Sequence, residues 1–154
     1  MSNSFRNVRV LIADDHGIIR DGVRSVLTHD LGMEVVGEAA DGQQAVRFAR
    51  ELHPDLIIMD INMPGMNGIE ATRTISHEMP EIKIVVLSMH ADKRYVVELL
   101  SLGVSAYLLK DCATRELAVA LDKVLHNKTY ISPDVGVDVI RDCLEQLGMK
   151  ESAS

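Results

Sequence analysis

The sequence predicts a doubly wound α/β protein, in which helices cover both faces of a five-stranded parallel sheet. Two observations favour this fold class. Five short runs rich in Val, Ile and Leu alternate strictly with longer amphipathic stretches, an order typical of repeated strand–helix units. Most of the short runs lack polar alternation, which indicates strands buried on both faces. A chain of 154 residues is long enough for one domain with a substantial core.

The predicted strands cover residues 8–13, 34–39, 56–59, 82–87 and 106–109. The longer stretches between them predict helices. Apolar stripes at helical spacing lie at residues 19–27, 95–100 and 117–125, and two further helices begin near residues 41 and 67. Two helix starts carry capping patterns, because Asp41 precedes Gln44 and Asn67 precedes Glu70 at the spacing of a capping box. Thr114 is the expected cap of the fifth helix.

The C-terminal part predicts a sixth helix that no strand precedes. Ser132 resembles a cap, Pro133 suits the first helical position, and Gly148 suits a helix stop. We therefore expect a domain over residues 6–128 and a linker helix with a tail over residues 129–154. That helix either packs on its own domain or leads to a further domain or partner.

Composition narrows the function. The net charge of −7 and the pI of about 5.3 argue against nucleic-acid binding by this chain itself. Cys112 and Cys143 lie far apart and lack metal-site spacing, which favours reduced thiols in a cytoplasmic protein. The N-terminal residues predict neither a signal peptide nor a membrane span.

Polar side chains follow the central strands of the predicted sheet. For a strand order of 2-1-3-4-5, the carboxyl ends of the first, third, fourth and fifth strands present Asp14, Asp15, Asp60, Ser88 and Lys110 to one crevice. Crowded carboxylates repel one another unless a cation is present. An oxygen-rich anionic site suits Mg²⁺ or Mn²⁺ rather than zinc. Beside such a metal, Asp60 is a credible nucleophile for phosphoryl transfer.

Each of these residues also has a simpler interpretation. A strand-end Asp often caps a helix, a lone Ser88 suits a turn, and a lone Lys110 suits a solvated charge. Their joint occurrence at one sheet edge favours the metal site. The loop after Asp60 adds to it, because the backbone carbonyl of Asn62 could bind the metal and its N–H could face a phosphoryl oxygen.

The motifs LIADDHGIIRDGV, LIIMDINMPGMNG, VVLSMH and AYLLKD, in this order, resemble the receiver domain of bacterial two-component response regulators over roughly residues 6–128. The DDH sequence and the LLKD ending resemble the NarL/LuxR branch of transcriptional regulators most. The resemblance implies a flavodoxin-like fold with the strand order given above.

The resemblance also implies metal-site roles. Asp60 matches the phosphoacceptor, Asp15 the direct metal ligand, and Asp14 the neighbouring acid that acts through water. Asn62 matches the position whose backbone carbonyl binds the metal, which is Mg²⁺ or Mn²⁺.

Further roles concern the phosphoryl group and the switch. Lys110, Ser88 and the backbone of Met89 match phosphoryl-contacting positions. Tyr107 matches the aromatic switch residue of the family. Its alternative interpretation is an aromatic side chain that packs in the sheet without a switching role. His16 and His90 are interpreted as solvent-exposed loop histidines.

The implied function is a phosphorylation-dependent switch rather than a turnover enzyme. A sensor histidine kinase would donate the phosphoryl group, and phosphorylation would favour a homodimer. The NarL/LuxR branch continues into a helix-turn-helix domain that binds DNA, for which residues 129–154 offer no counterpart. We expect either a chain cut at its linker or a receiver that stands alone.

Two alternatives remain. An interaction module that works without phosphorylation should lack one of the Asp or Lys residues, and none is missing. A haloacid-dehalogenase-type phosphatase needs a second carboxylate two residues after its nucleophile, where Asn62 stands.

Overall fold

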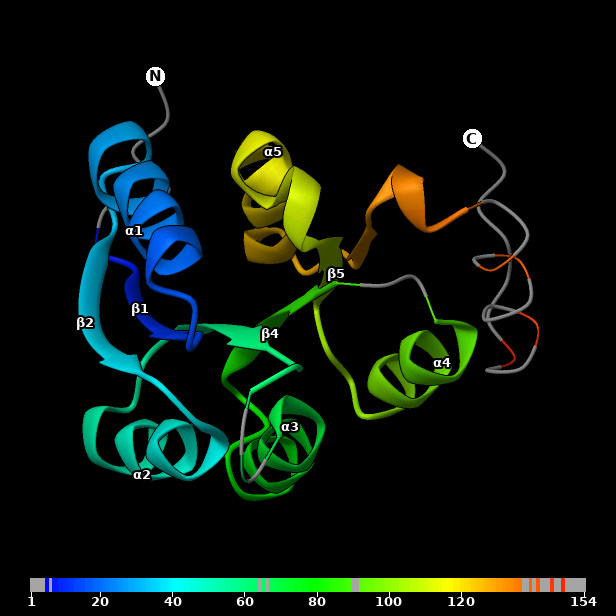
Figure 1. Ribbon diagram of the computed structural model, residues 1–154, viewed down its shortest axis with the longest axis horizontal. Coiled ribbons are helices and arrows are strands. Elements are labelled where there is room, and N and C mark those ends of the chain that lie inside the picture. Colours follow the sequence, from blue (N-terminus) through cyan, green and yellow to red (C-terminus); the bar gives the residue numbers. More distant parts are fainter. Residues whose placement is uncertain are drawn as a thin grey trace.

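The computed structural model describes residues 5, 7–63, 65, 67–89, 92–136, 139, 141, 145 and 148. Its centre is a parallel sheet in the order β2-β1-β3-β4-β5-β6 (Figure 1). The strands are β1 (Arg9–Ala13), β2 (Glu34–Ala39), β3 (Leu56–Asp60), β4 (Lys83–Ser88), β5 (Ala106–Leu109) and β6 (Tyr130–Ile131). The predicted order of the first five strands is confirmed.

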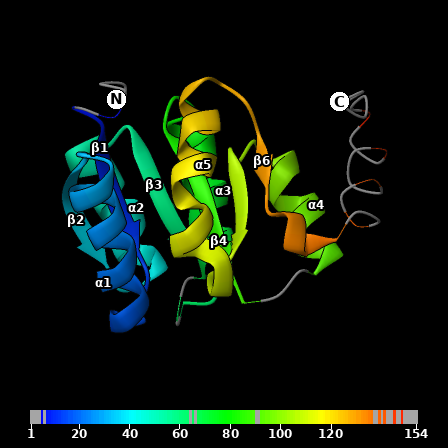
Figure 2. The same cartoon turned by 90° about the horizontal axis from the view of Figure 1, so that it is seen from above.

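Helices cover both faces of the sheet, as the sequence predicts. They are α1 (Gly17–Ser25), α2 (Gly42–Leu52), α3 (Gly68–Glu78), α4 (Lys93–Ser101) and α5 (Ala113–Leu125). A π-helical turn, η1 (Val26–Asp30), continues α1. Helices α1 and α5 lie on one face, and α2, α3 and α4 lie on the other (Figures 1 and 2).

Successive strand residues point to opposite faces and enter two separate cores. Leu11 and Ile57 belong to the cluster that packs against α2, α3 and α4. Ile12 and Ile58 belong to the cluster that packs against α1 and α5. Because both faces are buried, β3 is apolar until its last residue, Asp60.

The caps of α2 and α3 follow the predicted pattern. The Asp41 carboxylate accepts a hydrogen bond from the Gln44 backbone N–H at 2.8 Å, and the Asn67 side chain accepts one from the Glu70 N–H at 2.9 Å. The prediction that Thr114 caps α5 is wrong. A 3-10 turn, η2 (Lys110–Cys112), leads directly into α5, so Thr114 lies inside the helix.

The prediction that no strand precedes the C-terminal segment is also wrong. Residues Tyr130–Ile131 pair in parallel with β5 as β6, and a two-residue strand is too short to leave a periodic pattern. Ser132 does precede a helical turn with Pro133 at its start, but this turn is the 3-10 helix η3 (Pro133–Val135) and ends at Gly136. Most of the predicted sixth helix, including Cys143, falls outside the described residues.

No helix in the described part of the chain combines the length and apolar character needed to span a membrane.

Candidate functional site

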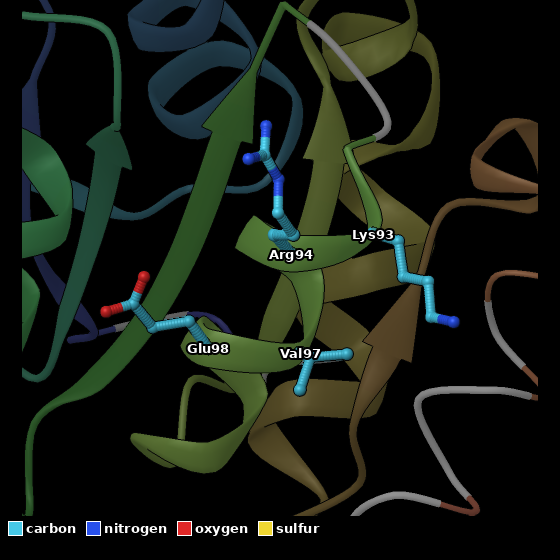
Figure 3. Close-up of a pocket in the computed structure, with 4 residues that line it drawn as sticks. All are labelled: Lys93, Arg94, Val97 and Glu98. Atoms are coloured by element: carbon cyan, nitrogen blue, oxygen red, sulfur yellow. The ribbon is translucent and has the colours of Figure 1, made fainter.

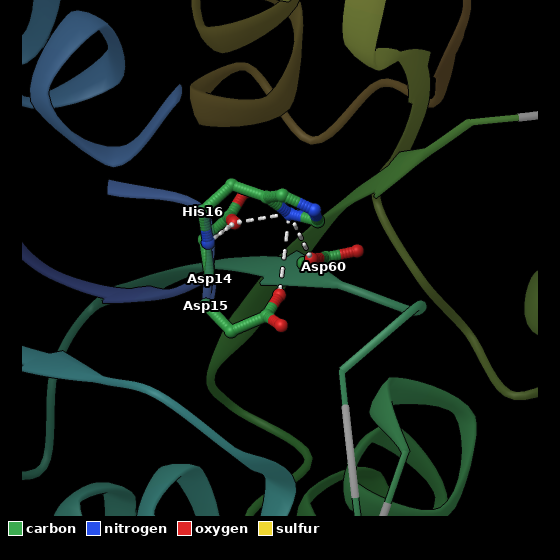
Figure 4. Close-up of side chains that lie close together, drawn as sticks. All are labelled: Asp14, Asp15, His16 and Asp60. Atoms are coloured by element: carbon green, nitrogen blue, oxygen red, sulfur yellow. Dashed lines mark hydrogen bonds and ion pairs between the residues drawn. The ribbon is translucent and has the colours of Figure 1, made fainter. Parts of the chain in front are cut away.

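An acidic cluster forms where β1, β3 and β5 end. Asp14 follows β1, Asp60 is the last residue of β3, and Lys110 follows β5. Parallel pairing aligns these ends, because Ala13 pairs with Met59 and Asp60 with Leu87 of β4. Figure 4 shows that Asp14, Asp15 and Asp60 surround one small space. The sequence predicted this convergence.

One cation is built into the cluster. Lys110 Nζ lies 2.7 Å from Asp60 Oδ2 and 3.9 Å from Asp14 Oδ1, and all three side chains are buried. Lys110 is therefore no solvated surface charge. Among the described residues, Lys110 is the one buried ammonium group at the site, and it contacts Asp14 and Asp60. With Asp15 beside them, the side-chain carboxylates outnumber this buried counter-charge.

The Asp14 carboxylate is incompletely satisfied. Its Oδ1 accepts the backbone N–H of His16 at 2.7 Å, whereas its buried Oδ2 has no hydrogen-bond partner among the described residues. Burial, and next the negative charge of Asp60, raises the pKa of Asp14 above its ordinary value against the lowering effect of the His16 N–H. A bound divalent cation or its water would satisfy this oxygen, and three carboxylates are the ligand type that Mg²⁺ and Mn²⁺ prefer.

The prediction that His16 is a solvent-exposed loop histidine is confirmed, because the residue precedes α1 and is exposed. What the sequence did not show is that its ring lies beside the carboxylates. Its side chain is 49% exposed, but Nδ1 lies 3.3 Å from Asp14 Oδ1, 3.2 Å from Asp15 Oδ1 and 3.7 Å from Asp60 Oδ2. Position beside Asp15 was the only signal in the sequence. His90 lies outside the described residues.

The loop after β3 is tied to the phosphoacceptor candidate. The backbone N–H of Asn62 donates to Asp60 Oδ1 at 2.8 Å, and the Asn62 side-chain oxygen accepts the N–H of Met89 at 3.3 Å. These two backbone positions therefore lie at the site, as the sequence predicted. The start of α3 packs closely against the same backbone, because a Cβ at Gly68 would lie 2.2 Å from the Asp60 carbonyl oxygen.

Ser88 lies on β4, next to the strand of Asp60, and Tyr107 lies on β5, one strand further. Ser88 ends β4, one residue past the partner of Asp60, and its side chain is buried. Tyr107 pairs with Val86 and is fully buried in the cluster under α3 and α4. This position agrees with a packed strand aromatic, and the role of Tyr107 as a switch stays a prediction.

Sequence reasoning missed Arg20. Its Nη1 donates to the backbone carbonyl of Asp14 at 3.0 Å, and its Nε lies 3.0 Å from Glu38 Oε1. Arg20 thus connects the end of β1 to β2 from the first turns of α1. A long side chain that reaches two strands leaves no local pattern that could have revealed it.

A separate pocket lies on α4, lined by Lys93, Arg94, Val97 and Glu98 (Figure 3). None of the predicted site residues lines it. Glu98 forms an ion pair with Arg73 of α3, which gives this carboxylate a structural partner. The acidic cluster is therefore the better candidate site.

Comparison with known proteins assigns the fold to a family. Residues 10–122 match the response regulator receiver domain family. The transcriptional regulatory protein DegU of Brevibacillus brevis is 40% identical over 135 residues, which cover 88% of this chain and 57% of DegU. The chain thus spans little more than half the length of this relative.

Two solved structures agree with this assignment. A two-component response regulator of the LuxR family from Aurantimonas sp. SI85-9A1 superposes with a TM-score of 0.81 at 34% identity, covering 88% of this chain and 97% of that one. The isolated receiver domain of RcsB from Salmonella enterica serovar Typhimurium gives 0.77 at 30% identity, with 84% and 96% coverage. The family match, these relatives and the sheet order together show that the chain belongs to the receiver domains of two-component response regulators, with relatives of the LuxR/NarL type.

Proposed function

We propose that this chain is a phosphorylation-dependent switch in which Asp60 accepts a phosphoryl group from a sensor histidine kinase, in a reaction that requires Mg²⁺ or Mn²⁺. The observation that carries the proposal is the buried contact of Asp60 with Lys110 beside the unpartnered oxygen of Asp14. Asp60 is the candidate nucleophile, Lys110 is a fixed cation, and Asp14 Oδ2 is an oxygen that could serve a metal or its water. All three lie at one edge of the sheet.

The proposed metal ligands are the carboxylates of Asp15 and Asp60 and the backbone carbonyl of Asn62, with Asp14 acting through water. Bound there, the metal would neutralise negative charge on the phosphoryl oxygens. The unpartnered Asp14 oxygen and the shortage of buried positive charge support this ligand set.

The chain's own residues carry out the remaining work. An Asp60 carboxylate oxygen attacks phosphorus in line, forming a P–O bond while the P–N bond of the donor phosphohistidine breaks and its electron pair leaves with nitrogen. Lys110, held at the site by burial, neutralises charge on the transferring group. In this structure the backbone N–H groups of Asn62 and Met89 donate to Asp60 Oδ1 and to the Asn62 side chain. We propose that both turn to phosphoryl oxygens once the group is transferred.

The output follows from the added charge, since a phosphoryl group brings about one to two negative charges. We propose that Ser88 bonds the phosphoryl group and that Tyr107 repacks in response, which biases the α4–β5–α5 face toward a homodimer. DegU is a transcriptional regulatory protein. By analogy with it, we propose that residues 6–128 form the receiver domain. Residues 129–154 would then lead toward a DNA-binding output domain.

Intact-protein mass spectrometry after incubation with acetyl phosphate tests the proposal. A single phosphoryl adduct should form with Mg²⁺, and it should disappear with EDTA or in Asp60→Asn. Retention of the adduct in Asp60→Asn would reject the assigned nucleophile. A folded protein that forms no adduct under any condition would favour an interaction module that works without phosphorylation.

A further inference from the structure

The ring of His16 enters the acidic cluster instead of capping the helix that it precedes. His16 is the N-cap residue of α1, and its side chain makes no capping hydrogen bond. Figure 4 shows the ring turned toward the three carboxylates. One ligand atom each from Asp14, Asp15, His16 and Asp60 lies within 4.8 Å of the others, so a single ion could contact all four residues.

The backbone holds His16 in this position from both sides. Its N–H donates to Asp14 Oδ1 at 2.7 Å, and its carbonyl accepts the N–H of Arg20 at 2.9 Å in the first turn of α1. Because the backbone is fixed, the ring needs only side-chain rotation to adjust. Its exposure of 49% places it on the solvent side of buried Asp14 and Asp60.

The contact between Lys110 and His16 identifies the ring nitrogen that faces the acidic cluster. Lys110 Nζ lies 2.9 Å from His16 Nδ1, and an ammonium group has donors but no acceptor. The same Nδ1 lies 3.3 Å from Asp14 Oδ1 and 3.2 Å from Asp15 Oδ1. It is therefore the ring atom that faces both the cation and the carboxylates, and a metal bound there would take its lone pair.

We propose that His16 Nδ1 is an additional metal ligand that makes this receiver favour Mn²⁺ and similar transition metals over Mg²⁺. Mg²⁺ keeps to oxygen ligands. Mn²⁺ shares the preference for carboxylates but, as a first-row transition metal, also accepts imidazole nitrogen, although less strongly than Zn²⁺ or Ni²⁺ does. Replacing His16 therefore weakens binding of Mn²⁺ much more than binding of Mg²⁺. This inference rests on the metal site of the proposed function and adds a selectivity that carboxylates alone do not supply.

The test uses electron paramagnetic resonance of Mn²⁺ on the protein as it is. Titration gives the Kd of Mn²⁺, competition gives the Kd of Mg²⁺, and electron spin-echo modulation detects a nitrogen bound to Mn²⁺. Histidine labelled with ¹⁵N in the imidazole ring alone distinguishes ring nitrogen from backbone nitrogen. His16→Phe keeps a planar ring without ligand atoms. The matched control is His77→Phe, at an exposed position near the end of α3.

We expect histidine nitrogen modulation in the unmodified protein and in His77→Phe, and its loss in His16→Phe. The Kd of Mn²⁺ should rise about tenfold or more in His16→Phe, while that of Mg²⁺ changes less than about threefold. If Mn²⁺ binds equally well to both proteins without nitrogen modulation, the inference about His16 is wrong and the proposed function stands. If Mn²⁺ does not bind the unmodified protein at all, the metal site of the proposed function fails as well.

Discussion

Lys110 Nζ and Asp60 Oδ2 lie 2.7 Å apart in the buried centre of the site, although the two residues are 50 positions apart in the chain. The same ammonium group lies 3.9 Å from Asp14 Oδ1. It is therefore the shared counter-ion of two buried carboxylates. Removal of Lys110 leaves both carboxylates without a fixed positive charge. The free energy of unfolding and its response to metal should both change as a result.

Lys110→Met should lower the free energy of unfolding in EDTA by about 3 kcal/mol, because it leaves buried carboxylates unpaired. Saturating Mg²⁺ should restore part of this loss, since the metal supplies positive charge to the same oxygens. Urea denaturation with EDTA and with Mg²⁺ measures both effects. Lys123→Met, at an exposed position of α5, is the control, and equal stability of the two variants in EDTA would contradict the buried-pair argument.

Asp14→Asn should raise the melting temperature at pH 7 in EDTA, by an amount equivalent to roughly 1 kcal/mol. Burial raises the pKa of Asp14 above its ordinary value of 3.8, so the folded state binds this proton more tightly than the unfolded state. The resulting stability is present below pH 3.8 and is lost as pH rises through the raised pKa. Asn carries no charge and should remove this part of the pH dependence.

Calorimetry from pH 3 to pH 8 checks the sign. The two proteins should converge at the acidic end, where Asp14 is protonated in both states, and diverge as pH rises. Mg²⁺ should reverse the order at pH 7, because only the unmodified protein offers the carboxylate to the metal. An unmodified protein that is the more stable of the two at pH 7 in EDTA would show that Asp14 is not strained by its burial.

The parts of the fold that the sequence predicts correctly are those set by repeated patterns. Buried strands such as β3 carry continuous apolar runs, and the strand order then brings Asp14, Asp60 and Lys110 to one edge. The direction of the His16 ring was not predictable, because it depends on a side-chain rotation that no pattern encodes. β6 was missed for a different reason, since two residues carry no period.

The error at Thr114 has a packing cause. A Cβ added at Gly22 of α1 would lie 3.3 Å from the Thr114 methyl group, so Thr114 faces α1 inside the first turn of α5. Capping propensity describes an isolated helix end, whereas here the 3-10 turn after β5 determines where the helix begins. Tertiary contact between α1 and α5 thus overrides the local signal.

Gly68→Ala should destabilise the fold by about 2 kcal/mol, because the added methyl group overpacks the backbone of Asp60. A Cβ there would lie 2.2 Å from the Asp60 carbonyl oxygen and 2.5 Å from Ile61 Cα, and neither backbone atom can move without displacing β3. The rate of adduct formation with acetyl phosphate should fall with stability. Urea denaturation and intact mass measure the two effects.

Gly17→Ala is the matched control for that substitution. Gly17 opens α1 just as Gly68 opens α3, but a Cβ at Gly17 would meet nothing within 4 Å. The free energy of unfolding of Gly17→Ala should stay within about 0.5 kcal/mol of that of the unmodified protein. If the two variants lose stability equally, the loss at Gly68 reflects helix propensity at a first position rather than contact with the phosphoacceptor strand.

Cys112 should react slowly with iodoacetamide, because its Sγ donates a hydrogen bond to Asp134 Oδ2 at 2.8 Å. That bond, together with burial, raises the pKa of the thiol from 9.0 to about 11. At pH 8 the reactive thiolate should be about 100-fold scarcer than in the urea-unfolded chain. The stability linked to this thiol is present below pH 9 and disappears as pH rises toward 11.

Peptide mass analysis resolves Cys112 from Cys143 and yields the rate of modification of each thiol. Asp134→Asn should raise the rate at Cys112 at least about tenfold, and a pH–rate midpoint near 9 in the unmodified protein would refute the role of Asp134.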